Sequence, residues 1–585
     1  MSQGLSARHE TGRVVRRSMD EPDEPLPARM LNEWAYCPRL FHLMHVQRIF
    51  VDNRATVEGR GQHDRGRATT RAEDLGGEPP WDQASVREHV FASADGRIVG
   101  KFDAIGTAVD GAIVPVEAKR GRAPEDDREF QILGLPCPDG VWPNDFVQVA
   151  AQGVLARDSG YRCVEARVHY RGSRKTVVVP LDDRAVAVVD AVVAAARATI
   201  RGPMPDPLAD SPKCFGCSLN GICLPDETRL VNGQTADPPR KLLPGRADGG
   251  AMYVVSQGAS VGKSGETLTV RHRDERPAES VPLKDVEHVS LFGHAQISSQ
   301  AVALLLEEGK HVFWHRRSGQ LVGFASPPGS PNVAMRRAQF RAAELLEHRL
   351  DVARLLVAAK VANQRTLVRR NLPEHPLRSN WLEALGRARI GALSAETLDG
   401  LRGHEGLGAR IYFEAVSEWL ARSTPAAGGI VFKGRSRRPP RDPVNAALSF
   451  GYALLTSDAV AAVRRVGLDP DVGFLHDEVP GRPALALDLM EPFRPVVVDS
   501  LVLRAFTTGE LSPDMFVEVS GAGVRMKDPA RRTLLEAYER RMDELVTHPM
   551  FDYRVSYRRC MELDARLLGR FLLGDVRAWQ PMVTR

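Results

Sequence analysis

Residues 225–250, PDETRLVNGQTADPPRKLLPGRADGG, interrupt the chain with a stretch rich in Pro, Gly and polar side chains. The stretch carries no sustained apolar period, which is typical of a linker between domains. A chain of 585 residues is also too long for one hydrophobic core and predicts roughly three or four domains. We therefore predict two differently built halves that meet near residue 240.

The apolar pattern differs on the two sides of this stretch. Residues 97–120 form two β-rich runs around Asp110–Gly111, and helical segments follow over 145–156 and 182–200. Residues 251–325 are strand-like, whereas helical spacing begins near Met335 and continues. We predict a multidomain protein with these parts: a flexible leader (1–27), an α/β domain (28–225), a linker (226–250), a small β domain (251–330) and a mainly α-helical domain (331–585).

Charge is unevenly divided between the halves. Residues 1–240 contain 31 Lys and Arg against 34 Asp and Glu, whereas residues 241–585 contain 48 against 40. A basic second half is compatible with a nucleic-acid surface, although an Arg-rich protein from a GC-rich genome would look the same. The chain lacks the ~18 uninterrupted apolar residues of a membrane span, and its charged start lacks the apolar region of a secretory signal. We expect a cytoplasmic protein with no membrane partner.

The first half contains the residue types of a divalent-metal nuclease site. His63, Asp103, Glu117 and Lys119 lie in the contexts EGRGQH, GKFD and VEAK. Glu117 and Lys119 share one face of a strand because side chains alternate with a period of two. Two carboxylates and an imidazole suit Mg²⁺ or Mn²⁺ that activates water, and a lysine can neutralise charge on a phosphate. Each residue alone more often forms a salt bridge, so the prediction depends on their order, followed by Gln148 on a helix.

Seven cysteines in 585 residues are too few for the disulfide framework of a secreted domain. Three of them crowd into CFGCSLNGIC, and one lies far upstream in NEWAYCPRL; they are Cys214, Cys217, Cys223 and Cys37. This spacing is typical of a metal or cluster site. Four thiolates bind either structural Zn²⁺ or an iron–sulfur cluster, and the spacing alone slightly favours zinc. The other three are predicted to be inert thiols: Cys137, Cys163 and Cys560.

The helical part contains a second set of candidate metal ligands. Glu405 is predicted to open a helix in HEGLGARIYF, and His476 ends VGLDPDVGFLH. Asp488 and Glu491 are three residues apart in ALDLMEPFRP, which places both on one helix face. Glu, His and Glu suit a divalent metal, with Asp488 as a neighbouring ligand or a partner that orients one. Taken singly, such residues are more often helix-end or surface groups.

Basic side chains lie close to this set in the sequence. GRSRRPPRDP carries Arg435, Arg437 and Arg438, and Arg494 follows Glu491 in EPFRP. A solvated basic loop is the default interpretation, but beside a metal site these guanidiniums would contact DNA phosphates. VGKSGET at 261–267 has a Gly-Lys-Ser without the earlier Gly of a phosphate-binding loop, so we predict a strand turn there.

The motif order of the first half resembles the RecB-like family of the restriction-endonuclease-type nuclease fold. In that family the helix motif runs from Gln to Tyr, whereas here Gln152 stands at the Tyr position. An early YCPR cysteine and a late triplet around such a core resemble the CRISPR-associated "Cas-four" exonucleases over residues 28–225. The resemblance implies a four-iron, four-sulfur cluster on the four grouped cysteines. It also implies Mg²⁺ or Mn²⁺ at His63, Asp103 and Glu117, with Lys119 and Gln148 as catalytic residues.

From Met252 onward the chain resembles the CRISPR "Cas-one" integrase family. The matching stretches are FGHAQISSQA, AKVANQ, EGLGARIYF, DPVNAALSFGYALL, GFLH and DLMEPFRP. The resemblance implies that Glu405, His476 and Glu491 hold a divalent metal where a free DNA 3′-hydroxyl attacks a phosphodiester of a receiving duplex. It further implies an integrase homodimer bridged by a small "Cas-two" partner that this chain does not contain.

Together the two resemblances predict a fusion that acts in CRISPR adaptation. The first half would select and trim double-stranded DNA with 3′ overhangs next to a protospacer-adjacent motif, and the second would insert it into CRISPR repeat DNA. Two alternatives remain open. One is a RecB-like nuclease fused to a branched-DNA resolvase of DNA repair, and the other is a first half that binds and measures DNA without cutting it.

Overall fold

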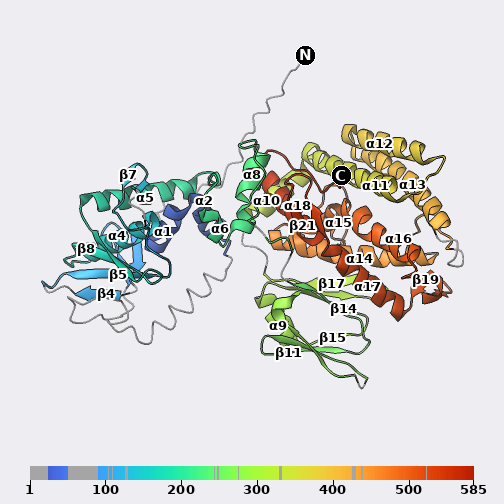
Figure 1. Cartoon of the computed structure of the whole chain (residues 1–585), viewed down its shortest axis with the longest axis horizontal. Helices are drawn as coiled ribbons and strands as arrows, with labels where there is room; N and C mark the ends of the chain where they lie inside the picture. Colours follow the sequence, from blue (N-terminus) through green and yellow to red (C-terminus); the bar gives the residue numbers. More distant parts are fainter. Residues whose placement is uncertain are drawn as a thin grey trace, which may run out of the picture. The chain divides into compact units, whose positions relative to one another are not determined.

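The computed structural model describes residues 24–50 and 90–584, apart from 103, 108–109, 126–128, 243, 247–248, 275, 329–332, 424–429, 437–438 and 522. The chain divides into two compact units, Met1–Pro225 and Asp226–Arg585 (Figure 1). Four residues singled out by the sequence lie outside the described residues: His63, Asp103, Arg437 and Arg438.

A four-stranded sheet forms the centre of the first unit (Figure 1). Its order is β4-β5-β8-β9, over Ala104–Thr107, Ile113–Lys119, Glu165–Tyr170 and Lys175–Pro180. β5 pairs with β4 antiparallel and with β8 parallel, and it is buried at four successive positions, as expected for a strand covered on both faces. The predicted β4–β5 hairpin turns at Asp110–Gly111, where Gly111 adopts φ +79°.

Two long helices of the first unit match the predicted helical segments closely. α4 spans Pro143–Asp158 and α5 spans Asp183–Arg201. Pro143 suits the first helical turn, and the Asp182 carboxylate caps α5 by accepting from the amide of Ala185 at 2.9 Å. α4 packs against β5, which places its inward-facing polar side chains over the middle of the sheet. The α/β prediction for this half is confirmed at the level of secondary structure.

Short elements at the two sequence extremes of the described first unit carry the grouped cysteines. α1 (Ala28–Tyr36) buries Leu31 and Trp34 and packs on α4. Cys37 separates α1 from α2 (Pro38–Phe41), and the late triplet lies on or beside α6 (Lys213–Gly216) and α7 (Asn220–Cys223). A small sheet completes this part of the unit, in the order β1 (Leu26–Pro27), β3 (Ile98–Lys101) and β2 (Val90–Ala92).

The helix α8, over Pro225–Val231, occupies the start of the segment predicted as a linker. Its residues Glu227 and Thr228 are almost completely buried. The hydroxyl of Tyr553 donates to Glu227 at 3.0 Å, and Arg570 donates to the hydroxyl of Thr228. The linker prediction is therefore wrong for these residues. Polar contacts with residues more than 300 positions away in sequence hold the helix. Such contacts produce no apolar period in the helix's own sequence, so the pattern does not reveal it.

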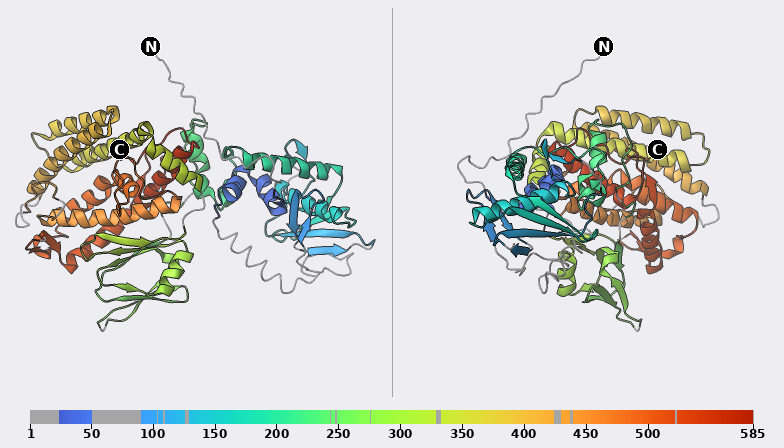
Figure 2. Two further views of the ribbon diagram at one scale, coloured as in Figure 1. Left: turned by 180° about the vertical axis from the view of Figure 1, so that it is seen from behind. Right: turned by 60° about the vertical axis from the view of Figure 1, so that its left-hand side comes forward.

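After α8, the second unit continues with a β domain of two four-stranded sheets (Figure 2). One has the order β10-β14-β16-β17, over Gly250–Val254, Val286–Phe292, His311–His315 and Leu321–Ala325. The other has the order β13-β12-β11-β15, over Glu279–Pro282, Thr267–Arg271, Ser260–Ser264 and Gln296–Ile297. Helix α9 (Ser299–Glu307) packs on β11 and β16. The VGKSGET segment is the β11–β12 turn, as predicted, with Gly265 at φ +59°.

A helical domain follows, as the sequence predicts (Figure 2). Its helices are α10 (Val333–Glu344), α11 (Leu346–Asn371), α12 (Arg378–Ser394), α13 (Leu398–Ser423), α14 (Pro443–Val466), α15 (Ala484–Met490), α16 (Ser500–Thr507), α17 (Asp528–Met542) and α18 (Tyr557–Leu573). A π-helical turn, η4 (Arg494–Asp499), joins α15 to α16. Two small hairpins interrupt the helices: β18–β19 (Phe516–Val519, Gly523–Met526) and β20–β21 (Leu545–Thr547, Arg554–Ser556).

One expectation about a site residue differs from the structure. Glu405 was predicted to open a helix, but α13 begins seven residues earlier, at Leu398, so that Glu405 lies two turns inside it. Four glycines weaken the helical pattern of this stretch, so the sequence did not indicate the earlier start of the helix; they are Gly400, Gly403, Gly406 and Gly408.

Helix α14 is long and apolar enough to cross a membrane by length and composition alone. In the structure, 83% of its most apolar window is buried inside the protein. It packs against α18, α15 and η4, so its apolar surface is that of a core helix.

Candidate active sites and cysteine pocket

The first candidate site is built on β5 and α4. Glu117 and Lys119 leave the same face of β5, and the ammonium of Lys119 donates to Glu117 Oε1 at 3.1 Å. Gln148 from α4 completes a triangle: its amide nitrogen donates to the same Glu117 oxygen at 2.7 Å, and its carbonyl oxygen accepts from Lys119 at 2.7 Å. The structure thus brings together the three predicted residues of this site that lie within the described part.

Gln152, which stands at the family's Tyr position, also belongs to this site. It lies one turn after Gln148 on α4, and its amide nitrogen donates to Glu117 Oε2 at 3.0 Å. Both carboxylate oxygens of Glu117 are therefore held by amide donors, and the carboxylate is buried. A buried carboxylate with fixed oxygens is preorganised for a role at a metal or phosphate.

Asp145 is a site residue that the sequence reasoning missed. Its carboxylate lies 3.6 Å from the Lys119 ammonium, accepts from the Tyr170 hydroxyl at 3.0 Å and accepts from Asn32 at 3.2 Å. Burial raises the pKa of Asp145, and the nearby Lys119 charge opposes that rise. Its spacing of three residues from Gln148 on one helix face is the signal that would have found it.

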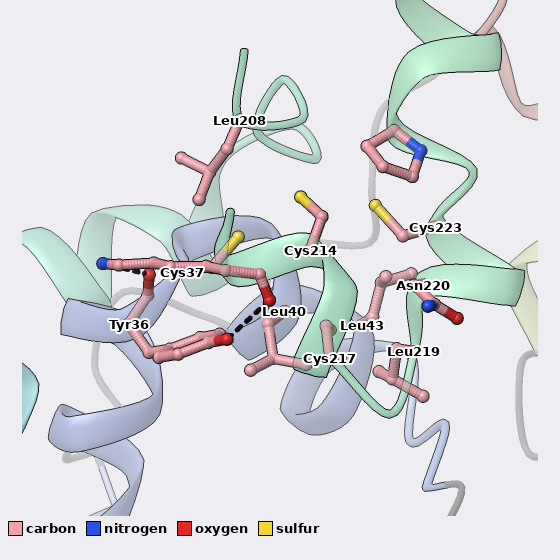
Figure 3. A pocket seen from close by; sticks show the side chains of 12 residues that line it. Tyr36, Cys37, Leu40, Leu43, Leu208, Cys214, Cys217, Leu219, Asn220 and Cys223 are labelled. Atoms are coloured by element: carbon pink, nitrogen blue, oxygen red, sulfur yellow. Dashed lines mark hydrogen bonds between the residues drawn. The ribbon is translucent and has the colours of Figure 1, made fainter. Parts of the chain in front are cut away.

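The four grouped cysteines meet in one pocket of the first unit (Figure 3). Its other lining residues are largely apolar and include Leu40, Leu43 and Leu208. Burial raises the pKa of the Cys217 thiol to about 12, and it also raises the pKa of Cys37. The neutral forms of these two thiols are thus favoured in the protein alone, and a bound cation would oppose this by stabilising the thiolates. Four cysteines lining one apolar pocket suit zinc or an iron–sulfur cluster in kind, but among the described residues no three of these thiols stand close enough to hold a metal ion as they lie.

A reciprocal pair of hydrogen bonds closes this pocket. The Tyr36 hydroxyl donates to the backbone oxygen of Lys213 at 2.6 Å, and the Lys213 ammonium donates to the backbone oxygen of Tyr36 at 3.0 Å (Figure 3). Since Cys37 follows Tyr36 and Cys214 follows Lys213, these bonds hold the early and late cysteine segments together.

The second candidate site lies in the helical domain and joins three separate elements. Glu405 comes from α13 and Glu491 directly follows α15. Lys360, from α11, lies between them: its Nζ is 2.5 Å from Glu405 Oε1 and 2.8 Å from Glu491 Oε2. The predicted ligands Glu405 and Glu491 therefore converge on a shared cation.

His476 reaches the same place from the loop before α15. Its Nδ1 lies 2.6 Å from Asp488 Oδ1, and its Nε2 lies 3.8 Å from Glu491 Oε1. The Asp488 carboxylate also accepts from the backbone amides of Phe474, Leu475 and His476 at 2.5–2.9 Å. Asp488 thus fixes the loop and the ring, and it leaves Nε2 directed at the site, as carboxylates do behind metal-binding histidines.

Arg494 pairs with Glu491 and stacks on a tyrosine ring. Arg494 Nη1 is 3.0 Å from Glu491 Oε1, and its guanidinium lies over the Tyr452 ring at 5.0 Å from the centroid. Although burial favours the neutral acid, Arg494 and Lys360 lower the pKa of Glu491 to about 2. Glu491 is therefore an anion at neutral pH. Arg435 lies over the same Tyr452 ring, 5.4 Å from its centroid, and donates to Asn445 Oδ1 at 2.7 Å and to the Ser449 hydroxyl at 3.0 Å.

The donor set of the second site fits a hard divalent cation in kind, with two carboxylates and one imidazole. Glu491 Oε2 is buried and has no hydrogen bond, so its lone pairs remain available beside Lys360. Within residues 24–50 and 90–584, as far as described, no three His, Cys, Asp or Glu side chains stand close enough to hold a metal ion. For Glu405, His476 and Glu491 to hold one metal ion, their side chains would therefore have to move closer together.

Known proteins similar to this chain identify its family. The model of the CRISPR-associated protein Cas1 matches residues 252–540. A protein of Geobacter sulfurreducens named CRISPR-associated exonuclease Cas4/endonuclease Cas1 fusion is 39% identical over 575 residues, which are 96% of this chain and 98% of that protein. The chain belongs to the Cas4/Cas1 fusion family. A Cas4/Cas1 fusion of Rhodospirillum rubrum is 36% identical and covers 95% of this chain and 93% of its own length.

Family membership confirms the resemblance of the whole chain to a Cas4/Cas1 fusion. The Cas4/Cas1 fusion is a CRISPR-associated enzyme that acts in CRISPR adaptation, with its Cas1 part in the largely helical second half. A Cas1 protein of Thermus thermophilus is similar to about half of the chain, with 41% identity over 319 residues, 53% of this chain and 95% of that protein.

Proposed function

We propose that this Cas4/Cas1 fusion trims captured DNA in its first unit and joins the trimmed 3′ ends to CRISPR repeat DNA in its second. The observation that carries the proposal is the convergence of Glu405, His476 and Glu491 from three elements on one buried, cation-rich spot. An imidazole whose other ring nitrogen is held by a dedicated carboxylate is the usual arrangement of a metal-binding histidine, and two further carboxylates lie beside it.

In the joining step, a DNA 3′-hydroxyl attacks a phosphodiester, a new phosphodiester forms and the old 3′-oxygen leaves, so no high-energy cofactor is needed. Glu405, His476 Nε2 and Glu491 would hold Mg²⁺ or Mn²⁺, which stabilises charge on the reacting phosphate when bound. Asp488, 2.6 Å from Nδ1, orients the His476 ring so that Nε2 faces the site. Arg494 contributes a fixed positive charge that favours an incoming phosphate.

For the trimming step, the RecB-like site would use Glu117 together with Asp103 and His63 as metal ligands. The ion pair of Lys119 with Glu117 and the hydrogen bond with Gln148 support a role for Lys119 in neutralising the cleaved phosphate. The hydrogen bond from Gln152 to Glu117 supports an intact site despite the missing Tyr.

We also propose the finer assignments that the resemblances imply. The cysteine pocket holds a four-iron, four-sulfur cluster, and the domains run over 28–225, 251–330 and 331–585. The integrase half forms a homodimer that assembles with the small Cas2 partner on double-stranded DNA with 3′ overhangs, in the cytoplasm. The basic second half supports contact with DNA.

A substrate-based assay tests the joining chemistry. The purified chain, Cas2 and Mn²⁺ are mixed with a repeat-containing plasmid and a prespacer that ends in either a 3′-hydroxyl or a 3′-dideoxynucleotide. We expect joining at the repeat with the 3′-hydroxyl end and none with the dideoxy end. Joining of both ends would contradict 3′-hydroxyl attack. In a parallel reaction with branched DNA as the substrate, cutting of that DNA by a protein that joins neither end would favour the resolvase interpretation.

The cluster assignment gives a separate prediction. Cys223→Ser is expected to abolish the absorbance near 400 nm and most of the bound iron of anaerobically purified protein, because one of four thiolate ligands is lost. Cys163→Ser, at a buried cysteine outside the pocket, is the matched control and should retain both. Stoichiometric zinc and a colourless wild-type protein would show that the pocket holds zinc instead.

A further inference from the structure

Lys360 is a buried lysine in the middle of helix α11. Its side chain is 8% exposed, and lysines are rarely buried unless they are paired, because an ammonium loses its hydration on burial. Here two carboxylates from different elements replace that hydration, Glu405 from α13 and Glu491 after α15. The lysine therefore holds together the two glutamates that would otherwise repel each other.

The position of this ammonium coincides with the position that a metal ion would need. An ion held by both glutamates would lie between their carboxylates, where Lys360 Nζ now stands 2.5 Å from Glu405 Oε1 and 2.8 Å from Glu491 Oε2. The contact with Glu491 Oε2 lacks hydrogen-bond geometry, so this oxygen is paired by charge alone. Arg494, by contrast, contacts the other oxygen, Oε1, at 3.0 Å.

We propose that Lys360 is a placeholder cation: it keeps Glu405 and Glu491 together before a divalent ion binds, and it gives up at least one of them when the ion arrives. This inference rests on the proposed integrase site. Counting the two glutamates, Lys360 and Arg494, the cluster is neutral without metal and carries two positive charges with it. Such a site attracts the phosphate of DNA after the metal has bound. The released ammonium, on its four-carbon stem, is then free to contact that phosphate.

A lysine that competes with the metal makes an unusual prediction about its removal. Lys360→Met takes away the competitor and its charge, so Mn²⁺ affinity is expected to rise by about tenfold or more. The protein without metal should be less stable, because two facing carboxylates lose their counter-ion. A lysine that merely supported the fold would instead weaken Mn²⁺ binding when replaced.

The test is a Mn²⁺ titration by electron paramagnetic resonance on the full chain, with melting temperatures measured in EDTA and in Mn²⁺. All variants carry Glu117→Gln so that the first site contributes less to binding. Lys360→Met should bind Mn²⁺ more tightly, melt lower in EDTA and gain more from Mn²⁺ than its parent. Unchanged or weaker Mn²⁺ binding would overturn the inference. If Lys360→Met fails to fold, Lys360→Gln tests the same expectation.

Two controls separate this inference from the proposed site. Arg494→Met also removes a positive charge beside Glu491, but not from between the two glutamates, so its gain should be clearly smaller; an equal gain would contradict the placeholder role. Glu405→Gln should weaken Mn²⁺ binding in the parent. If it does not, the proposed metal site itself fails, whatever Lys360→Met shows.

Discussion

Glu491→Gln is expected to reduce the rate of prespacer joining by about a hundredfold or more and to leave trimming unchanged. The wild-type carboxylate is a buried anion between Lys360 and Arg494, 3.8 Å from the His476 ring. An amide of the same shape supplies no charge to a metal ion and leaves two buried cations without their shared anion. Initial rates with a pre-trimmed prespacer, Cas2 and a repeat plasmid measure the effect.

Glu478→Gln provides the matched control for that substitution. Glu478 is an exposed residue two positions after His476. The Glu478→Gln variant should therefore join prespacers at the wild-type rate. If Glu491→Gln joins prespacers at the wild-type rate, Glu491 is not a ligand of the proposed metal site. A melting temperature far below that of the wild type in EDTA would point to misfolding, in which case Glu405→Gln, at a less buried position, gives the same test.

Lys119→Met is expected to slow trimming of 3′ overhangs by about a hundredfold or more without affecting the joining of pre-trimmed ends. The Lys119 ammonium contacts both Glu117 and Gln148. The substitution therefore removes a positive charge that lies directly against these two side chains. Methionine keeps most of the apolar stem and limits the loss of packing. Release of labelled nucleotides from overhangs in Mn²⁺ measures the rate.

Lys175→Met is the corresponding control, because Lys175 lies exposed on strand β9, which β8 separates from β5 in the same sheet. It should trim at the wild-type rate. Equal trimming by Lys119→Met and wild type would favour a first half that binds and measures DNA, with another protein making the cut.

Local sequence patterns were sufficient to predict where Glu117 and Lys119 of the first site lie relative to each other. The period of two on β5 placed Glu117 and Lys119 on one face, and the hairpin turn at Gly111 followed from its β-rich flanks. Gln152 is different. Its position was visible as a departure from the family, but its hydrogen bond to Glu117 depends on how α4 packs over β5.

The features that escaped prediction depend on contacts between distant segments. Helix α8 is held by Tyr553 and Arg570, hundreds of residues later, so composition alone made its sequence look like a linker. Lys360 was visible only as a letter in AKVANQ, because nothing local reveals that a lysine is buried between two glutamates. Asp488 is different: the sequence predicted it as a neighbouring ligand or an orienting partner, and its contact with His476 Nδ1, which favours the second, depends on the loop that carries His476 folding back onto α15.

The central claim is that one chain holds two separate active sites that work in sequence. One reaction tests it directly: an untrimmed prespacer, a repeat plasmid, Cas2 and Mn²⁺, incubated with wild type, Lys119→Met or Glu405→Gln, with junctions and free ends sequenced. We predict trimmed and joined DNA for wild type, untrimmed and unjoined DNA for Lys119→Met, and trimmed but unjoined DNA for Glu405→Gln. Loss of trimming in Glu405→Gln, or joining of untrimmed ends by Lys119→Met, would contradict two separate sites that work in sequence.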